Sequence, residues 1–177
     1  MADYLGADAI YVVTTGEDGL PLVGHALLYV QNADGSWYMT HFTGPKDDPT
    51  KARIELSYVS LENINAYLAS DGVNHIYISG DFSASYELAK RYDGTDYGGY
   101  CLLTNNCLHY VKELLRKGTP NSMLYSLAFT RLTIVPIVFY TVLSNTQVAI
   151  SAVSSLKEKN KGSKSGSQYL ACYIKEY

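Results

Sequence analysis

One cysteine stands at the start of a strongly predicted helix, where a thiol is readily made a nucleophile. Cys107 is followed by apolar residues at helical spacing, namely Leu108, Val111, Leu114 and Leu115. Unpaired N–H groups and the dipole of a helix N-terminus favour the thiolate, so we expect the pKa of Cys107 to be lowered. The alternative is a buried helix cysteine behind ordinary cap residues.

The residues directly before this cysteine are Asn105 and Asn106. Asparagine is a preferred helix cap, so we expect one of them to accept a hydrogen bond from the first turn. One of the two amides, together with the backbone N–H of Cys107, would stabilise an oxyanion.

A catalytic thiol needs a base, and imidazole is the usual one because its pKa is near neutral. His25 stands in a predicted strand between Gly24 and Ala26, whose small size leaves room for another group. His41 lies near the end of the next predicted strand. If the hairpin loop is centred on Ala33, positions 25 and 41 are directly opposite and share a face, so the second imidazole would fix the tautomer of the first. A one-residue change in register would move His41 to the other face.

Of the other histidines, His109 is expected to pack or to support the site from behind, and His75 is expected to be at the surface or structural. His109 follows Cys107 by two helical positions and should point away from the thiol, and His75 opens a predicted strand. No close pair of Cys or His ligands is present, and phosphate-loop, dinucleotide and GxSxG motifs are absent from the sequence. We therefore expect no metal site and no cofactor.

The elements that must position these residues alternate between strands and helices. Strands are predicted at 9–15, 22–30, 36–42, 54–59 and 73–79, and helices at 61–70, 82–92 and 107–118. Ser60 and Asp81 are the expected caps of the first two helices, and Asn32 to Gly35 form the hairpin turn. The fold class is therefore α+β, with an antiparallel sheet packed against helices.

The C-terminal third contains a long apolar segment. The charge-free run 132–156 is as long as a membrane span, but it contains Pro136 and several polar residues. Strands or a buried helix that complete the core are favoured over membrane contact, and the β-branched run 132–142 predicts a strand. Residues 157–168 read as a loop and 169–177 as an edge strand.

The length and composition of the chain limit the number of domains it can form. The chain has 177 residues and is 47% hydrophobic, enough for one domain over 1–177, with a core at about 9–118 and a C-terminal extension at 119–177. A net charge of −3, well mixed along the chain, argues against nucleic acid as a partner. The 17 tyrosines fit sheet packing better than an aromatic binding platform.

Cysteine usage and the N-terminus bear on the compartment. The odd set Cys101, Cys107 and Cys172 is not a disulfide framework. Residues 1–22 are acidic and lack a basic segment followed by an apolar run, so no secretory signal is expected. The chain is cytoplasmic or is exported, as an effector-like domain, by a route that its N-terminus does not encode.

The order of a strand histidine, a second polar strand residue and a helix-start cysteine resembles the circularly permuted papain-like hydrolases of the NlpC superfamily. The local likeness is to the lecithin retinol acyltransferase-like branch, whose helix begins Asn, Cys, Glu, His, Phe; here the run is Asn106, Cys107, Leu108, His109, Tyr110. The segment GHALLYV around His25 looks like that family's histidine strand. The motifs cover about thirty residues, and Leu108 replaces the family's acidic residue.

This resemblance implies a permuted papain-like fold in which Cys107 attacks a carbonyl, His25 is the base and His41 takes the third position. The leading expectation is a cysteine peptidase or amidase acting on a peptide or isopeptide bond, in bacterial cell-wall peptide or in a target protein. The alternatives are a lipid acyl hydrolase or acyltransferase, supported by membrane-surface docking of the apolar segment, and a non-catalytic binding module of the same fold.

Overall fold

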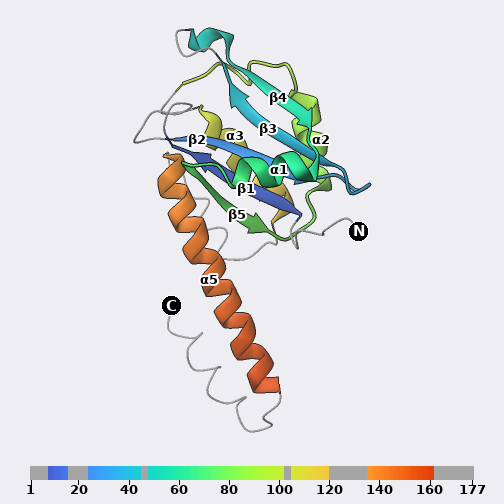
Figure 1. Cartoon of the computed structure of the whole chain (residues 1–177), viewed down its shortest axis with the longest axis vertical. Coiled ribbons are helices and arrows are strands. Elements are labelled where there is room, and N and C mark those ends of the chain that lie inside the picture. Colours follow the sequence, from blue (N-terminus) through green and yellow to red (C-terminus); the bar gives the residue numbers. More distant parts are fainter. Residues whose placement is uncertain (1–7, 16–23, 45–47, 102–104, 120–134, 162–177) are drawn as a thin grey trace.

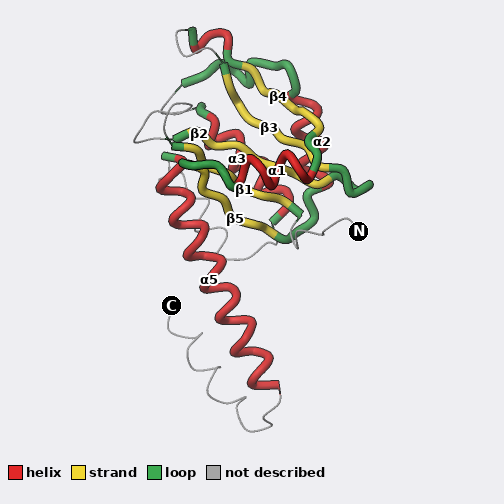
Figure 2. The backbone as a smooth tube through the Cα atoms, in the orientation of Figure 1, coloured by secondary structure: helices red, strands yellow, loops and turns green. Residues whose placement is uncertain are grey.

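A single antiparallel sheet forms the centre of the molecule. The computed structural model describes residues 8–15, 24–44, 48–101, 105–119 and 135–161. Five strands lie in the order β4-β3-β2-β1-β5 (Figures 1 and 2). They are β1 (Ala9–Thr14), β2 (His25–Gln31), β3 (Trp37–Thr43), β4 (Arg53–Tyr58) and β5 (Val73–Ile78). The predicted α+β class with an antiparallel sheet is thus confirmed.

Helices cover both faces of this sheet. The described helices are α1 (Leu61–Leu68), α2 (Ser83–Tyr92), α3 (Cys107–Gly118) and α5 (Pro136–Lys161), with a 3-10 turn η1 (Pro49–Lys51) before β4. Helix α3 packs on β2 and β3, α2 lies beside α3, and α5 contacts β1 and β5. Figure 1 shows α1 crossing the opposite face, and α5 running away from the body of the fold.

The alternation of side chains along each strand divides the core into two clusters. On the α3 side, Ala26 and Leu28 of β2 pack with Cys107, Leu108 and Val111. On the α1 side, Leu27 and Tyr29 pack with Ile64 and Leu68 of α1. Strand β2 is buried on both faces, which explains why its sequence is almost continuously apolar.

The hairpin between β2 and β3 forms as predicted but with a different centre. Leu27 pairs with His41 and Gln31 with Trp37, so the loop is centred on Asp34 rather than Ala33. Gly35 adopts a positive φ of 85°, and Asp34 accepts a hydrogen bond from the Ser36 N–H at 2.8 Å. These turn contacts set the register. Each β2 residue therefore pairs with a β3 residue two positions further along the chain than predicted. A shift of two positions keeps every side chain on its predicted face of the sheet.

Of the two predicted helix caps, one is confirmed and the other differs. Ser60 caps α1, accepting from the Asn63 N–H at 3.3 Å, as predicted. Helix α2 begins at Ser83, with Phe82 rather than Asp81 at the cap position. The Asp81 carboxylate nevertheless accepts from the Ser83 N–H at 3.1 Å. It thus provides a hydrogen-bond acceptor for the first N–H of the helix, although it lies one residue before the cap position.

The predicted strand at 132–142 is wrong where the structure describes it, because α5 begins at Pro136 and continues to Lys161. Proline suits the first turn of a helix, and β propensity is a weak preference that packing overrides. Phe139 and Leu143, one helical turn apart, are fully buried in the core. Tyr11 donates from its hydroxyl to the Pro136 carbonyl at 3.0 Å and stacks edge-on against Phe139.

The remaining C-terminal predictions are tested only in part. Residues 157–161, predicted as a loop, belong to α5, while 162–168 and the predicted edge strand 169–177 lie outside the described residues. Among the described helices, none is long and apolar enough to span a membrane.

The outer edge of β4 is paired with a loop segment rather than a strand. The Ile54 N–H donates to the Thr95 carbonyl, and the Gly94 N–H donates to the Ile54 carbonyl, both at 2.9 Å. The Leu56 N–H donates to the Asp93 carboxylate at 3.0 Å. The segment after α2 therefore closes this edge of the sheet.

Candidate active site

Cys107 is the first residue of α3, as the sequence predicts. Asn106 caps the helix: its side-chain oxygen accepts from the His109 N–H at 3.1 Å, and its own N–H donates to His109 Nδ1 at 3.4 Å. This reciprocal pair is a capping box, with histidine in the place that Glu or Gln usually takes. His109 therefore stabilises the start of the helix, consistent with the supporting role predicted for it.

The thiol of Cys107 is held against the first residues of β2. The Ala26 N–H donates to Cys107 Sγ at 3.5 Å. The ladder between β2 and β3 ends at the Leu27–His41 pair, so Ala26 lies one residue beyond the last pair. The sulfur thus takes the place of a strand partner at the open end of the hairpin ladder.

The environment of the thiol changes one expectation. Cys107 is only 3% exposed, and burial raises its pKa above the usual value, although hydrogen bonds from the N–H groups of Ala26 and Leu108 and from the Tyr100 hydroxyl oppose the shift. The predicted lowering of the Cys107 pKa is therefore wrong in sign, because desolvation outweighs the helix N-terminus. The protonated thiol is therefore the favoured form of Cys107 in the folded protein.

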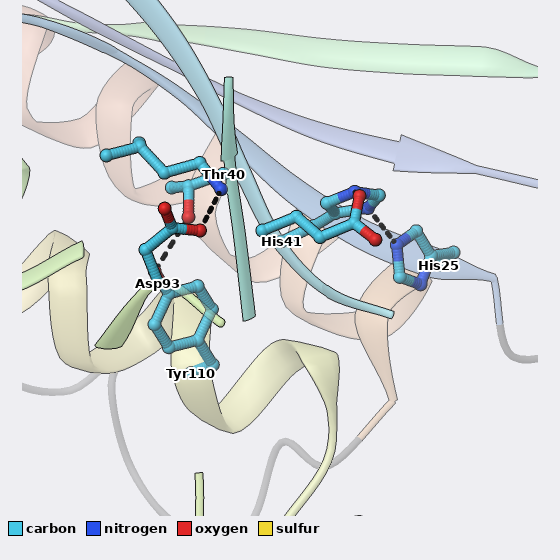
Figure 3. A network of polar contacts seen from close by, with 7 residues as sticks. His25, Thr40, His41, Asp93 and Tyr110 are labelled. Carbon is cyan, nitrogen blue, oxygen red and sulfur yellow. Dashed lines mark hydrogen bonds and ion pairs between the residues drawn. The ribbon is translucent and has the colours of Figure 1, made fainter. Parts of the chain in front are cut away.

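The two predicted histidines meet. His25 Nε2 and His41 Nδ1 are 3.0 Å apart, with ring centroids 5.3 Å apart at 70° (Figure 3). The rings are diagonal neighbours in the ladder rather than directly opposite, so the pairing geometry differs from the prediction while the predicted contact is confirmed. Their residues lie at the same open end of the ladder as the sulfur.

The sequence analysis did not identify the next group in this chain of contacts. Glu55 of β4 pairs directly with His41, and its Oε2 lies 3.3 Å from His41 Nε2. Burial lowers the pKa of His41, with Glu55 acting in the opposite direction. The long connection 44–52 hides the register of β4 from sequence reasoning, so no local signal assigns Glu55 to His41.

Two further polar side chains border the site. Tyr100 lies next to the Cys107 thiol through its hydroxyl, and burial raises the pKa of Tyr100 to about 12. Thr14 is paired directly with His25 across the β1–β2 ladder. Its hydroxyl is buried and has no hydrogen-bond partner within the described part of the chain, so it is a polar group available beside the imidazole.

The remaining predicted residues have structural partners. The Asn105 side-chain amide donates to the carbonyls of Tyr97 and Gly99, each at 2.7 Å. Both of its N–H groups hold the loop before α3, so the Asn105 amide is engaged there and not in the predicted oxyanion role. The His75 ring lies edge-on to Tyr77 within β5, consistent with the surface or structural position expected for it. The described residues contain no group of three or more Cys, His, Asp or Glu side chains able to hold a metal ion.

Comparison with known proteins adds nothing to this geometry: no family model, no curated protein and no solved structure matches the chain.

Proposed function

We propose that this protein is a cysteine-dependent hydrolase, a peptidase or amidase, in which Cys107 is the nucleophile, His25 the base and His41 its orienting partner. The observation that carries the proposal is the hydrogen bond from Ala26 N–H to Cys107 Sγ at 3.5 Å. It fixes the thiol beside the residue that follows His25. The permuted papain-like arrangement belongs to this proposal, on the order of His25, His41 and Cys107 and on the motif they resemble.

The two groups approach from different sides of the sheet. By strand alternation His25 belongs to the side of Leu27, whereas Cys107 packs with Ala26 on the other side. The ladder between β2 and β3 has ended at this level, and the Ala26 N–H donates to the sulfur. We propose that proton transfer takes place through this opening.

The reaction then follows ordinary acyl-transfer chemistry. His25 takes the proton from the Cys107 thiol, and the sulfur attacks the carbonyl carbon of the substrate. The tetrahedral intermediate collapses as the carbon–nitrogen bond breaks, and the leaving amine takes the proton from the His25 imidazolium. Water, deprotonated by His25, hydrolyses the resulting thioester, which releases a carboxylic acid and restores the thiol. In this mechanism the Cys107 N–H at the start of α3 stabilises the oxyanion.

An activated ester tests the proposal without knowledge of the natural substrate. The parent for this experiment carries Cys101→Ser and Cys172→Ser, because Cys101 is exposed and would react by itself. We expect p-nitrophenyl acetate to leave one acetyl group on Cys107, detected by intact mass, with turnover to p-nitrophenol. Cys107→Ala should abolish both, and His25→Ala should abolish turnover. His75→Ala is the matched control and should leave both unchanged.

The outcomes separate the alternatives. Turnover retained in Cys107→Ala, or no adduct in the parent, would overturn the hydrolase proposal in favour of a binding module. Acylation by the ester without cleavage of any member of a degenerate fluorogenic peptide mixture would overturn its amide-bond part.

A further inference from the structure

A loop residue lies against the thiol that the proposed mechanism uses. Cys107 is buried, so the carbonyl group of a substrate reaches Sγ only after a neighbouring group moves. Its neighbours Ala26 and Leu108 belong to β2 and α3, where sheet and helix hydrogen bonds hold the backbone. Tyr100 differs from them, because it lies in the segment between α2 and α3 and its hydroxyl donates to the sulfur.

The ring of Tyr100 packs on the core from this segment. Its centroid lies 5.2 Å from that of Phe42 in β3, with the two planes tilted by 59°. Tyr100 is half-buried, whereas Phe42 and Cys107 are both buried. The Tyr100 ring is therefore a cover that lies between these two residues and the solvent.

The backbone directly before Tyr100 has the properties of a hinge. Gly98 and Gly99 adopt positive φ angles of 80° and 85°, and glycine also adopts negative values at no steric cost. A Cβ built on Gly99 would meet no atom within 4 Å, so the backbone at this position is not packed against the core.

Fixed points bound this hinge on both sides. Before it, the Tyr97 hydroxyl donates to the Glu113 carboxylate, and the Tyr97 ring lies edge-on to neighbouring aromatic rings. After it, the backbones of Cys101 and Asn105 exchange two hydrogen bonds, at 2.8 and 2.9 Å. The Asn105 side-chain amide also donates to the Gly99 carbonyl at 2.7 Å, which makes this bond a latch on the hinge.

We propose that Tyr100 is a lid over Cys107: residues 98–100 swing about Gly98 and Gly99, and a substrate reaches the thiol only while the ring is turned away. This inference rests on the proposed function for its catalytic meaning, because the lid controls access to the same nucleophile. The rate of any reaction at the sulfur is then the rate in the open form multiplied by the fraction of molecules that are open.

Alkylation of the thiol by iodoacetamide measures the opening without any need for turnover. Peptide mapping by mass spectrometry follows Cys107 separately from the other cysteines of the unaltered chain. Tyr100→Ala removes the cover and should raise the Cys107 rate by at least about tenfold at fixed pH. Tyr100→Phe keeps the ring and loses one hydrogen bond, so its rate should stay within about threefold of the parent. Tyr58→Ala, at an exposed tyrosine at the end of β4, is the matched control and should leave the rate unchanged.

The latch has a test of its own. Asn105→Ala removes the hydrogen bonds to the carbonyls of Tyr97 and Gly99 and should raise the Cys107 rate. Because the Asn105 side chain acts on the loop, a faster rate in this variant reports opening of the lid rather than a changed environment of the sulfur. An unchanged rate would overturn the role of this bond as the latch.

Low concentrations of urea separate opening of the lid from unfolding of the protein. Opening of three residues exposes little surface, so the parent rate should be nearly independent of urea below the unfolding transition. A steep rise with urea in this range would overturn the lid, because reaction would then require global unfolding. An unchanged rate in Tyr100→Ala, or Tyr100→Phe as reactive as Tyr100→Ala, would overturn the ring as the cover.

Failure of the lid and failure of the proposed function give different results. Faster alkylation in Tyr100→Ala, with no acetyl group transferred from p-nitrophenyl acetate to Cys107 in the parent or the variant, would overturn the hydrolase proposal and leave the lid. Acetylation of Cys107 with turnover, at a rate that Tyr100→Ala does not change, would overturn the lid and leave the hydrolase.

Discussion

Ala26 and Cys107, which are 81 residues apart in the chain, are joined by a hydrogen bond from a strand amide to a thiol at 3.5 Å. This bond fastens the first turn of α3 to the open end of the β2–β3 ladder. Substitutions at the thiol, at the histidine pair and in the packing of the sheet therefore test different parts of this arrangement.

The buried thiol should ionise at a higher pH than an ordinary cysteine. Because burial raises the Cys107 pKa, the folded protein favours the protonated form, and the thiolate fraction at a given pH is smaller than in an ordinary cysteine, whose pKa is about 8.5. In Cys101→Ser Cys172→Ser protein, the iodoacetamide rate should therefore keep rising beyond the pH at which N-acetylcysteine levels off. A plateau at or below neutral pH would contradict this direction.

The two histidines should contribute unequally to turnover. His25→Ala should lower kcat with p-nitrophenyl acetate nearly as much as Cys107→Ala, because members of one catalytic unit are not additive. His41→Ala should cost less, since it removes only the partner of the base. The double variant His25→Ala His41→Ala measures the coupling. If it is much worse than His25→Ala alone, the histidines do not act as one unit.

A buried hydroxyl pair under the sheet should be worth measurable stability. Thr40 Oγ1 and the Tyr110 hydroxyl are 2.7 Å apart, both residues are fully buried, and they join β3 to α3 (Figure 3). Thr40→Val should lower the free energy of unfolding by about 1–3 kcal/mol, because it leaves the tyrosine hydroxyl without this partner.

The matching variant is Tyr110→Phe, and urea denaturation of both single variants and the double variant gives the coupling. We expect the double variant to lose less than the sum of the single losses. Strict additivity would show that the two hydroxyls do not depend on each other.

The last residue of α3 should not tolerate a methyl group. A Cβ at Gly118 would overlap the ring of Phe82, which is itself 2% exposed. Replacing glycine by alanine in a helix usually stabilises by up to about 1 kcal/mol, but overpacking a filled core costs about 1–3 kcal/mol. Gly118→Ala should therefore lower the urea midpoint. Lys117→Ala, at the exposed neighbouring position, is the control and should leave the midpoint nearly unchanged. An unchanged or higher midpoint in Gly118→Ala would show that Phe82 moves aside at little cost.

Local signals in the sequence were sufficient for much of the fold. The apolar spacing after Cys107 predicts α3, and the turn of residues 32–35 predicts the hairpin. Ser60 and Asn106 are preferred cap residues at the starts of α1 and α3, respectively. The contact between His25 and His41 follows from that hairpin, because a shift of two positions preserves the face.

Properties that depend on packing between distant segments could not be predicted from local sequence signals. The burial that raises the Cys107 pKa comes from packing of α3 on β2, and the partnership of Glu55 with His41 depends on the register of β4 after a long connection. Helix α5 replaces a predicted strand because Phe139 and Leu143 find a site on the core, which local propensity does not report.

The loop that pairs with β4 also bears on how molecules of this protein meet one another. An uncovered edge strand offers amides and carbonyls as a template for strands of other chains, a common route to aggregation. Here Gly94 and Thr95 form hydrogen bonds with the backbone of Ile54, and the Asp93 carboxylate accepts one from the Leu56 N–H. The same segment that precedes the cysteine helix thereby protects that side of the sheet against intermolecular strand addition.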